Sequence, residues 1–204
     1  VHAQTIYVTP QSNRWNPGYK GSYYYPLGFS GIIATANAVP TLDTVIFLYP
    51  FAPASQSFTA QSLNVRTVTG VANCAVKLVI YASSPTTKRP TGTPILGSNT
   101  GQNCASSTTS QTVSISYTFS PDVVYWYGAA FTTGASSMHS ITTTENSLAA
   151  AVGRAALSNT ATGSISAPYT YATDIMTLDL TAATFTDMVP TGVPIFYLQC
   201  AATC

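Results

Sequence analysis

The chain has 204 residues and a formal net charge of +1 at pH 7, and only 6% of its residues are charged, against about 25% in an average soluble protein. Nucleic-acid binding needs clustered lysine and arginine, but the seven basic residues are scattered apart from Lys88 and Arg89, which we expect in a solvated turn. Hydrophobic residues make up 46% of the chain, yet no run of about 20 apolar residues could form a membrane-spanning helix. We therefore expect neither a nucleic-acid partner nor membrane insertion.

The chain is rich in uncharged polar residues instead of charged ones, with 22 serines and 32 threonines. Threonine is β-branched and favours strands. A surface of hydroxyl groups provides little electrostatic repulsion between molecules, so we expect the chain to be a subunit of a larger particle or oligomer. An ordinary secreted β protein is the alternative.

Residues 1–30 differ in composition from the rest of the chain. Glycine and proline between residues 14 and 26 exclude a long helix or a central strand there, and we expect an extended N-terminal arm. Its aromatic side chains need burial, either across a neighbouring subunit or on the arm's own domain, and both readings stay open. The candidate assembly residues of this arm are Trp15, Tyr19, Tyr23, Tyr24 and Tyr25.

Residues 31–204 are expected to form a single β-sandwich domain. The apolar positions between Phe58 and Leu63 change parity, which indicates a bulge or bend. Seven or more short strands separated by proline- and glycine-rich turns are typical of a sandwich. The expected strands cover residues 42–49, 58–68, 76–81, 112–119, 123–131, 175–180 and 193–199.

Two of these segments have the clearest patterns. Residues 112–119 alternate strictly between hydroxyl and apolar side chains, which predicts a strand with one buried face. Residues 123–131 are apolar on both faces, which predicts a central strand with Trp126 in the core. Turns are expected at 83–86, 90–94, 97–110 and 120–122. Only residues 147–157 could be helical, and an irregular loop is the alternative there.

The four cysteines are an even number, which permits two disulfides in an oxidising setting. Cys74 and Cys104 share the context Asn-Cys-Ala and are a candidate pair, while Cys200 and Cys204 lie near the C-terminus. Free thiols are the alternative. No Cys-x-x-Cys or histidine spacing suits zinc, and we expect no metal or other cofactor.

Groups for catalysis are scarce, with two histidines and six carboxylates in the whole chain. A glycosidase needs two facing carboxylates, but Asp174 and Asp179 would point to opposite faces of one strand. We expect no catalytic residues and no enzymatic activity, and a polysaccharide-cleaving enzyme is the weakest alternative.

Binding chemistry is better supplied, because the chain has 13 tyrosines and two tryptophans. Aromatic faces stack on sugars, and hydroxyl groups exchange hydrogen bonds with them. Besides the aromatics of the arm, Tyr169 and Tyr171 are candidates for glycan contact. The alternative for each of these residues is packing in the core or against another subunit.

Three groups of motifs stand out within residues 41–131. They are Tyr49-Pro50-Phe51-Ala52-Pro53 with Phe58 to Val65, Lys77 to Tyr81 with Pro90 to Leu96, and Val113 to Pro121 with Tyr125 to Ala129. Through these motifs the segment resembles a domain that recurs in tail-fibre and minor virion structural proteins of tailed phages. Asp122 stands where that family usually has glycine, although aspartate also tolerates turns. The resemblance implies a jelly-roll-like antiparallel β-sandwich, often trimeric, on the virion surface.

Three functions follow as hypotheses. The first is a non-enzymatic fibre or spike module of a virion, a homotrimer that binds a host-surface glycan. The second is a capsid decoration or cement protein that binds other virion proteins through its N-terminal arm. The third is a secreted lectin-like adhesin. Exposed aromatics in the tip loops at 83–110, 132–145 and 158–172 would favour host binding, whereas arm aromatics buried on another subunit would favour decoration.

Overall fold

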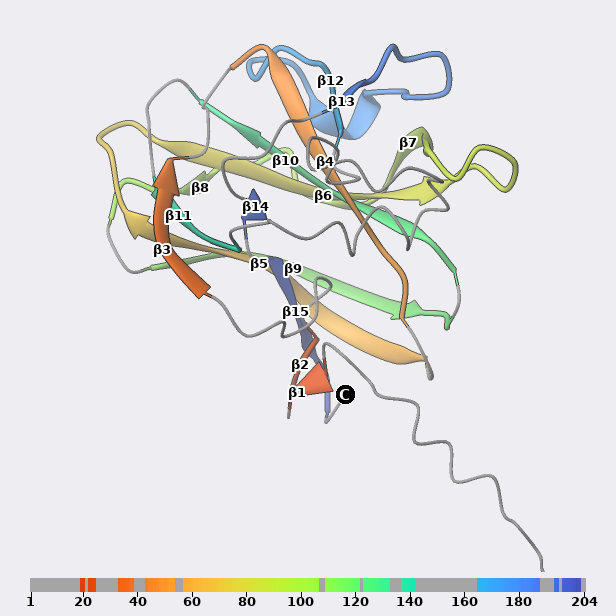
Figure 1. The fold of residues 1–204 in the computed structure, drawn as a ribbon, viewed down its shortest axis with the longest axis horizontal. Helices are drawn as coiled ribbons and strands as arrows, with labels where there is room; N and C mark the ends of the chain where they lie inside the picture. The colour runs from red at the N-terminus through yellow and green to blue at the C-terminus, as the bar shows by residue number, and fades with distance from the viewer. Residues whose placement is uncertain are drawn as a thin grey trace, which may run out of the picture.

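The fold is an all-β sandwich of two antiparallel sheets packed against each other (Figure 1). Within the described ranges the only helical segment is a short 3-10 turn. The computed structural model describes residues 19–20, 22–24, 33–38, 43–53, 57–106, 109–121, 123–132, 137–141, 165–187, 193–194 and 196–202.

The first sheet is built around the long strand β5 (Phe58–Thr69). One edge of β5 pairs with β9 (Ser110–Phe119), and the other pairs with β15 (Phe196–Cys200) and then β11 (Ser137–Ile141). The remaining strands of this sheet are β1 (Tyr19–Lys20), β2 (Tyr23–Tyr24), β3 (Ile33–Ala38) and β14 (Val193–Pro194).

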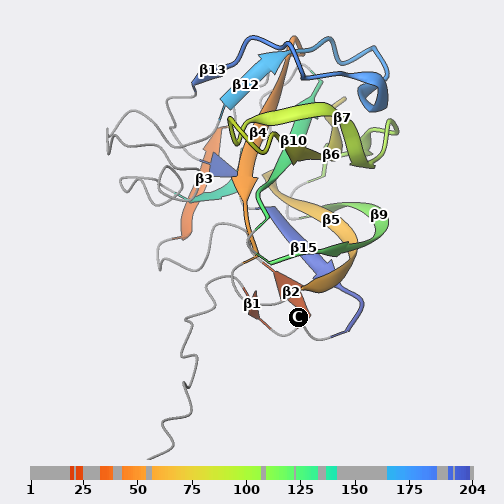
Figure 2. The ribbon, with the colours of Figure 1, turned by 90° about the vertical axis from the view of Figure 1, so that its right-hand side faces the viewer.

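The second sheet has β10 (Tyr125–Phe131) at its centre, between β4 (Val45–Phe51) and β6 (Ala75–Ser83). Its outer strands are β13 (Thr186–Asp187), β12 (Ile165–Pro168), β7 (Pro90–Gly97) and β8 (Gln102–Asn103). Figure 2 shows this sheet lying above β5, β9 and β15.

Aromatic side chains fill much of the core between the two sheets. Phe196 of β15 packs against Tyr127 of β10 and Tyr49 of β4, with ring centroids 4.2 and 4.5 Å apart. Because alternate residues of a strand point to opposite faces, β4 and β10 place every second side chain in this core.

A second apolar layer covers the other face of the second sheet. Residues 169–185, here called the cover segment, lie over β4, β10 and β6 (Figures 1 and 2). Ile175 and Leu180 of this segment are buried with Trp126 of β10. The double covering explains why residues 125–131 are apolar on both faces. The predicted central strand and the buried Trp126 are confirmed, although the strand begins at Tyr125 and Val123 is exposed.

The bulge predicted in β5 is also confirmed, because its register with β9 shifts between Ala60 and Ser62.

Two element predictions were wrong. Residues 90–94, expected as a turn, belong to β7, where an edge position tolerates proline. Residues 175–180, expected as a strand, begin with the 3-10 turn Ile175–Thr177. There the Asp174 side chain accepts a hydrogen bond from the Met176 N–H at 2.9 Å, a local bond that competes with strand pairing.

The described part of the N-terminal arm is a short hairpin on its own domain. β1 pairs with β2, and β2 pairs with β15 through Tyr23 and Tyr24. This arrangement agrees with the second of the two readings of the arm. Trp15, Tyr25 and residues 147–157, the one segment for which a helix was considered, lie outside the described residues.

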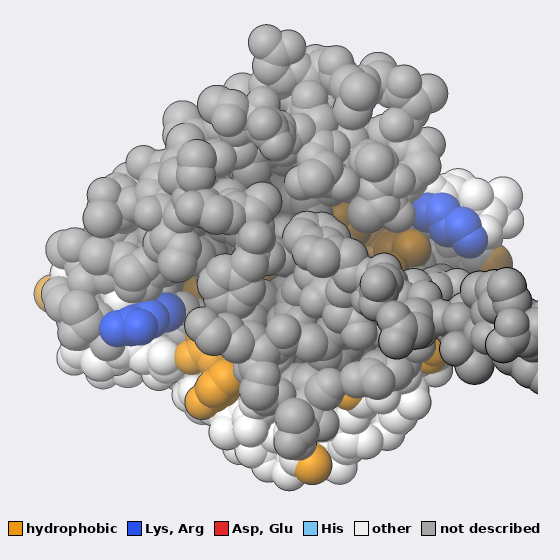
Figure 3. Space-filling view, turned by 60° about the horizontal axis from the view of Figure 1, so that its bottom comes forward, with side chains coloured by type: hydrophobic (Ala, Val, Ile, Leu, Met, Phe, Trp, Pro, Cys, Tyr) orange, Lys and Arg blue, Asp and Glu red, His pale blue; other side chains and the backbone are white. Residues whose placement is uncertain are grey.

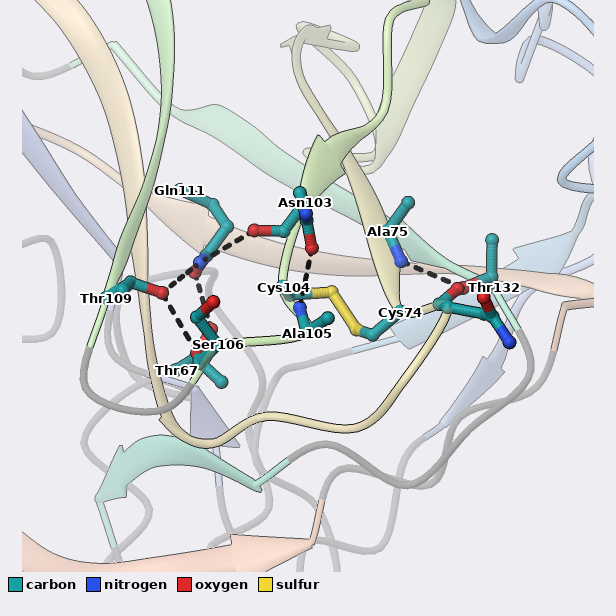
Figure 4. The surroundings of a disulfide bond; sticks show 11 residues. Thr67, Cys74, Ala75, Asn103, Cys104, Ala105, Ser106, Thr109, Gln111 and Thr132 are labelled. Carbon is teal, nitrogen blue, oxygen red and sulfur yellow. Dashed lines mark hydrogen bonds between the residues drawn. A yellow bond between two sulfur atoms is a disulfide. The ribbon is translucent and has the colours of Figure 1, made fainter.

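A disulfide joins Cys74, just before β6, to Cys104, just after β8 (Figure 4). Polar contacts surround it: Thr67 donates to the Gln111 side chain at 2.6 Å, and Gln111 donates to the Asn103 carbonyl at 3.2 Å. The bond therefore fixes the 97–110 loop to the end of the sandwich. Cys200 is also disulfide-bonded, and position 204 lies outside the described residues.

Candidate functional site

The two tyrosines predicted to contact glycan lie at the start of the cover segment, beside a buried lysine. Tyr169 is only 5% exposed and belongs to the apolar layer under the segment. Tyr171 is half-buried, and its ring lies 4.6 Å from Nζ of Lys77 on β6. Since Tyr169 presents no open aromatic face, the structure assigns it a packing role instead of glycan contact.

Lys77 is 5% exposed, and its ammonium group donates to three neutral acceptors. Nζ lies 2.7 Å from the Tyr171 carbonyl, 2.8 Å from the Thr173 carbonyl and 3.2 Å from the Tyr169 hydroxyl. Burial lowers the pKa of Lys77, and the nearby Asp174 carboxylate opposes that shift. Burial also raises the pKa of Tyr171 to about 12, and the neighbouring Tyr169 adds to this effect.

This cluster holds the cover segment in place. All three acceptors belong to residues 169–173, so one ammonium group secures the start of the segment to β6. Farther along, the Tyr81 hydroxyl donates to the Leu178 carbonyl at 3.3 Å, and the Leu180 N–H donates to the Gly92 carbonyl at 3.0 Å. The three hydrogen-bond donors of the Lys77 ammonium group are therefore all engaged within the cover segment.

A different surface, the outer face of the first sheet, combines uncharged polar groups with tyrosine rings. This outer face is the side of β9, β5, β15 and β2 that points away from the second sheet. Alternation creates it: on β9 the apolar side chains point to the core, while every intervening residue is an exposed serine or threonine. The outward side chains of β9 are Ser110, Thr112, Ser114, Ser116 and Thr118.

Hydrogen bonds join the strands across the middle of the outer face. Thr112 donates to the Asn64 side-chain oxygen at 2.8 Å, and the Asn64 amide donates to the Ser62 hydroxyl at 2.8 Å. Ser62 in turn donates to the Gln199 side chain at 3.3 Å. Asn64 is only 2% exposed, so these bonds hold its amide in one orientation beneath the surface.

Tyr197 of β15 extends across this network. Its hydroxyl donates to the Ser110 hydroxyl of β9 at 2.7 Å, although β5 lies between these two strands. The register places Asn64 of β5 between Tyr197 and Thr112, so the tyrosine side chain passes over β5 beside Asn64. On its other side Tyr197 meets the ring of Tyr23 edge-on, with centroids 5.7 Å apart.

Charge is sparse on this face. Among the described outward residues of β9, β5 and β15, only Arg66 carries a charge at neutral pH, and it lies opposite Ser110 at one end of the β5–β9 pairing. In Figure 3, where the underside of Figure 1 comes forward, the described surface shows basic side chains at two places and no acidic side chain. The outer face can therefore exchange hydrogen bonds and offer an aromatic ring, but it offers little charge.

The other predicted residues are distributed as follows. Tyr23 is 38% exposed at the edge of the outer face, and Tyr19 and Tyr24 lie in the hairpin strands. Lys88 and Arg89 are exposed in the turn between β6 and β7, as expected. The described parts of the three tip loops carry no aromatic residue besides Tyr169, which is buried, and Tyr171, which is half-buried, so they lack the exposed aromatics that would favour host binding through these loops.

Sequence reasoning did not single out Tyr197 or Gln199. The signal was present, because Phe196, Leu198 and Cys200 alternate with them and are buried. That pattern shows which side chains face outward, but not that Tyr197 reaches β9.

No group of three or more potential metal-binding side chains is found among the described residues. The same part of the chain contains no helix that could cross a lipid bilayer. Comparison with known protein families and with curated proteins finds no match for this chain.

Proposed function

We propose that this chain is a non-enzymatic surface module of a phage-type virion that attaches to a glycan on the host surface. The observation that carries the proposal is the outer face, where hydroxyl and amide groups surround the ring of Tyr197. Glycans present hydroxyl groups and apolar C–H faces, and such a surface can recognise both kinds of group.

The fold and composition support the same proposal. The all-β sandwich is the architecture that the phage-protein resemblance implies. Fold alone does not define function, so the proposal depends on the chemistry of the outer face. The hydroxyl and amide groups there suit binding and not proton transfer, because they do not ionise near neutral pH.

A capsid decoration role is the second candidate, and the exposure of Tyr23 favours it. This side chain is 38% exposed on the hairpin at the sheet edge, where a neighbouring virion subunit could cover it. The pairing of β2 with the chain's own β15 weighs against an arm whose main role is to reach another subunit.

The test uses the intact chain, carrying a fluorescent label, and bacterial cell envelopes from a panel of strains. Envelopes are treated either with periodate, which cleaves sugar diols, or with protease, which removes surface proteins. We expect binding to some strains, which periodate abolishes and protease preserves. Binding that protease abolishes and periodate preserves would refute glycan attachment, as would a failure to bind any envelope. Labelling of purified virions by an antibody against the chain tests the virion location separately.

A further inference from the structure

The outer face has the composition of a site for a particular class of glycan. Acidic glycans and nucleic acids require arginine or lysine to pair with their anionic groups. Among the described outward residues of β9, β5 and β15, Arg66 is the only charged side chain, and it lies opposite Ser110, at the end of the β9 row that Tyr197 reaches. The rest of the row, from Thr112 to Thr118, lies opposite no charged residue of β5, and no described outward residue of these strands is a carboxylate that would suit a cationic ligand.

A protein partner fits this face less well than a sugar chain does. The centres of protein–protein interfaces are rich in tyrosine, tryptophan, methionine and arginine and poor in serine, and serine and threonine are rare among the residues that dominate binding. The outward row of β9 consists entirely of serine and threonine. Among the side chains that the structure describes on this face, the tyrosine rings are those of Tyr197 and Tyr23, on the β15 and β2 side.

Much of the polar surface is preorganised. The Tyr197 side chain is held by its hydroxyl bond to Ser110 and by the edge-on contact with Tyr23. The Asn64 amide is fixed by Thr112 and Ser62. Groups that are already ordered lose less conformational entropy when a ligand binds, which favours recognition of a flexible, hydroxyl-rich chain.

The row on β9 has the form of an extended contact line. Outward residues of a strand repeat every two positions, or about 6.8 Å, and neighbouring strands lie about 4.8 Å apart. Ser110 to Thr118 therefore present a line of exposed hydroxyl groups about 27 Å long. Tyr197 crosses β5 to reach the Ser110 end of this line.

We infer that the ligand is an uncharged glycan, whose sugar units contact Tyr197 and exchange hydrogen bonds with the serine and threonine row of β9. The inference rests on the proposed attachment function and specifies its ligand class and its site. The serine and threonine hydroxyls act as both donors and acceptors, so they can pair with sugar hydroxyls in either sense.

The test is calorimetric titration of the intact chain with neutral gluco-, galacto- and manno-oligosaccharides and with acidic oligogalacturonates. We expect at least one neutral series to bind and the acidic series to bind more weakly. Tyr197→Ala should weaken neutral binding about fivefold to tenfold, in line with the contribution of one aromatic contact. Tyr197→Phe keeps the ring and should retain most of the affinity.

A second variant keeps the test decisive if Tyr197→Ala destabilises the sheet. Ser114→Asp places a charge on an exposed position of the β9 row and should also weaken neutral binding at least fivefold. Its matched control is Thr93→Asp, at an exposed position on β7 of the second sheet, which should bind like the unmodified chain.

Three results would overturn the inference. Preferential binding of oligogalacturonate would show that the ligand is acidic, while the attachment function would stand. Neutral binding that is unchanged in both Tyr197→Ala and Ser114→Asp would place the site elsewhere. If envelope binding survives periodate and no oligosaccharide binds, the proposed function fails together with the inference.

Discussion

Removal of the Cys74–Cys104 disulfide should lower the stability of the sandwich by an amount that the structure allows us to estimate. The two cysteines are 30 positions apart in the sequence. In the chain-entropy description, closing a loop of that length costs the unfolded chain about 3.6 kcal/mol of entropy at 25 °C. We therefore expect the double variant Cys74→Ala, Cys104→Ala to lose about 3–4 kcal/mol of unfolding free energy.

The assay is equilibrium unfolding in urea, with the midpoint and the slope of the transition both measured. Reductant cannot replace the variant, because Cys200 is also disulfide-bonded. An unfolded chain freed of the cross-link exposes more surface, so the slope should rise while the midpoint falls. A loss below about 1 kcal/mol with an unchanged slope would refute the reasoning, because the bond would then not constrain the unfolded state.

Three further predictions concern the core and the cover segment. Lys77→Met should lower the free energy of unfolding by about 1–3 kcal/mol, because the carbonyls of Tyr171 and Thr173 lose their donor. Amide hydrogen exchange in residues 169–178 should accelerate, and unchanged exchange would contradict the anchoring role of Lys77. Phe196→Ala should lower the free energy of unfolding, measured in urea, by about 3–5 kcal/mol, because it leaves a cavity between two core tyrosines. A loss below about 1 kcal/mol would contradict the packing described. Burial raises the pKa of Tyr127 well above its usual value and that of Tyr171 to about 12, so these groups stabilise the fold fully below pH 10 and less as the pH rises through their folded pKa values. The free energy of unfolding, measured by urea unfolding between pH 9 and 12, should therefore decrease above pH 10, by at most about 1.4 kcal/mol per pH unit for each tyrosine, and a flat profile would contradict this.

The parts of the fold that could be predicted are the strands whose side chains alternate regularly between apolar and polar along the sequence. Residues 112–119 alternate strictly, and the strand there has its hydroxyl residues exposed as expected. The parity change after Phe58 marks a bulge that the register confirms. Both signals come from the fixed alternation of side chains along a strand, which requires no knowledge of the neighbouring strands.

The errors arose at segments whose structure depends on contacts with parts of the chain that are distant in the sequence. Pro90 and Pro94 read as turn residues, but β7 is at the edge of its sheet, where a missing N–H is tolerated. Ile175 and Leu180 are apolar because they cover the second sheet, and not because they alternate along a strand. For the same reason Tyr169 appeared suitable for glycan contact, although the sheet beneath it provides an apolar layer that buries it.

In the candidate site, too, the sequence pattern predicts the direction of a side chain but not its partners from distant strands. The outward direction of Tyr197 can be derived from the buried residues on either side of it. Its bond to Ser110 joins residues 87 positions apart, and only the pairing of β15, β5 and β9 brings them together. A site built across three strands leaves no compact motif in the sequence.

The most direct test of the central claim is to locate the glycan contact on the folded chain by NMR. Backbone and side-chain signals are assigned, and shifts are recorded during titration with the neutral oligosaccharide that binds most tightly in calorimetry. The account predicts that the largest shifts cluster at Tyr197, Asn64 and the outward residues of β9, while Lys77 and Tyr169 stay unchanged. Shifts confined to the cover segment or to the turn at Lys88 and Arg89 would contradict it.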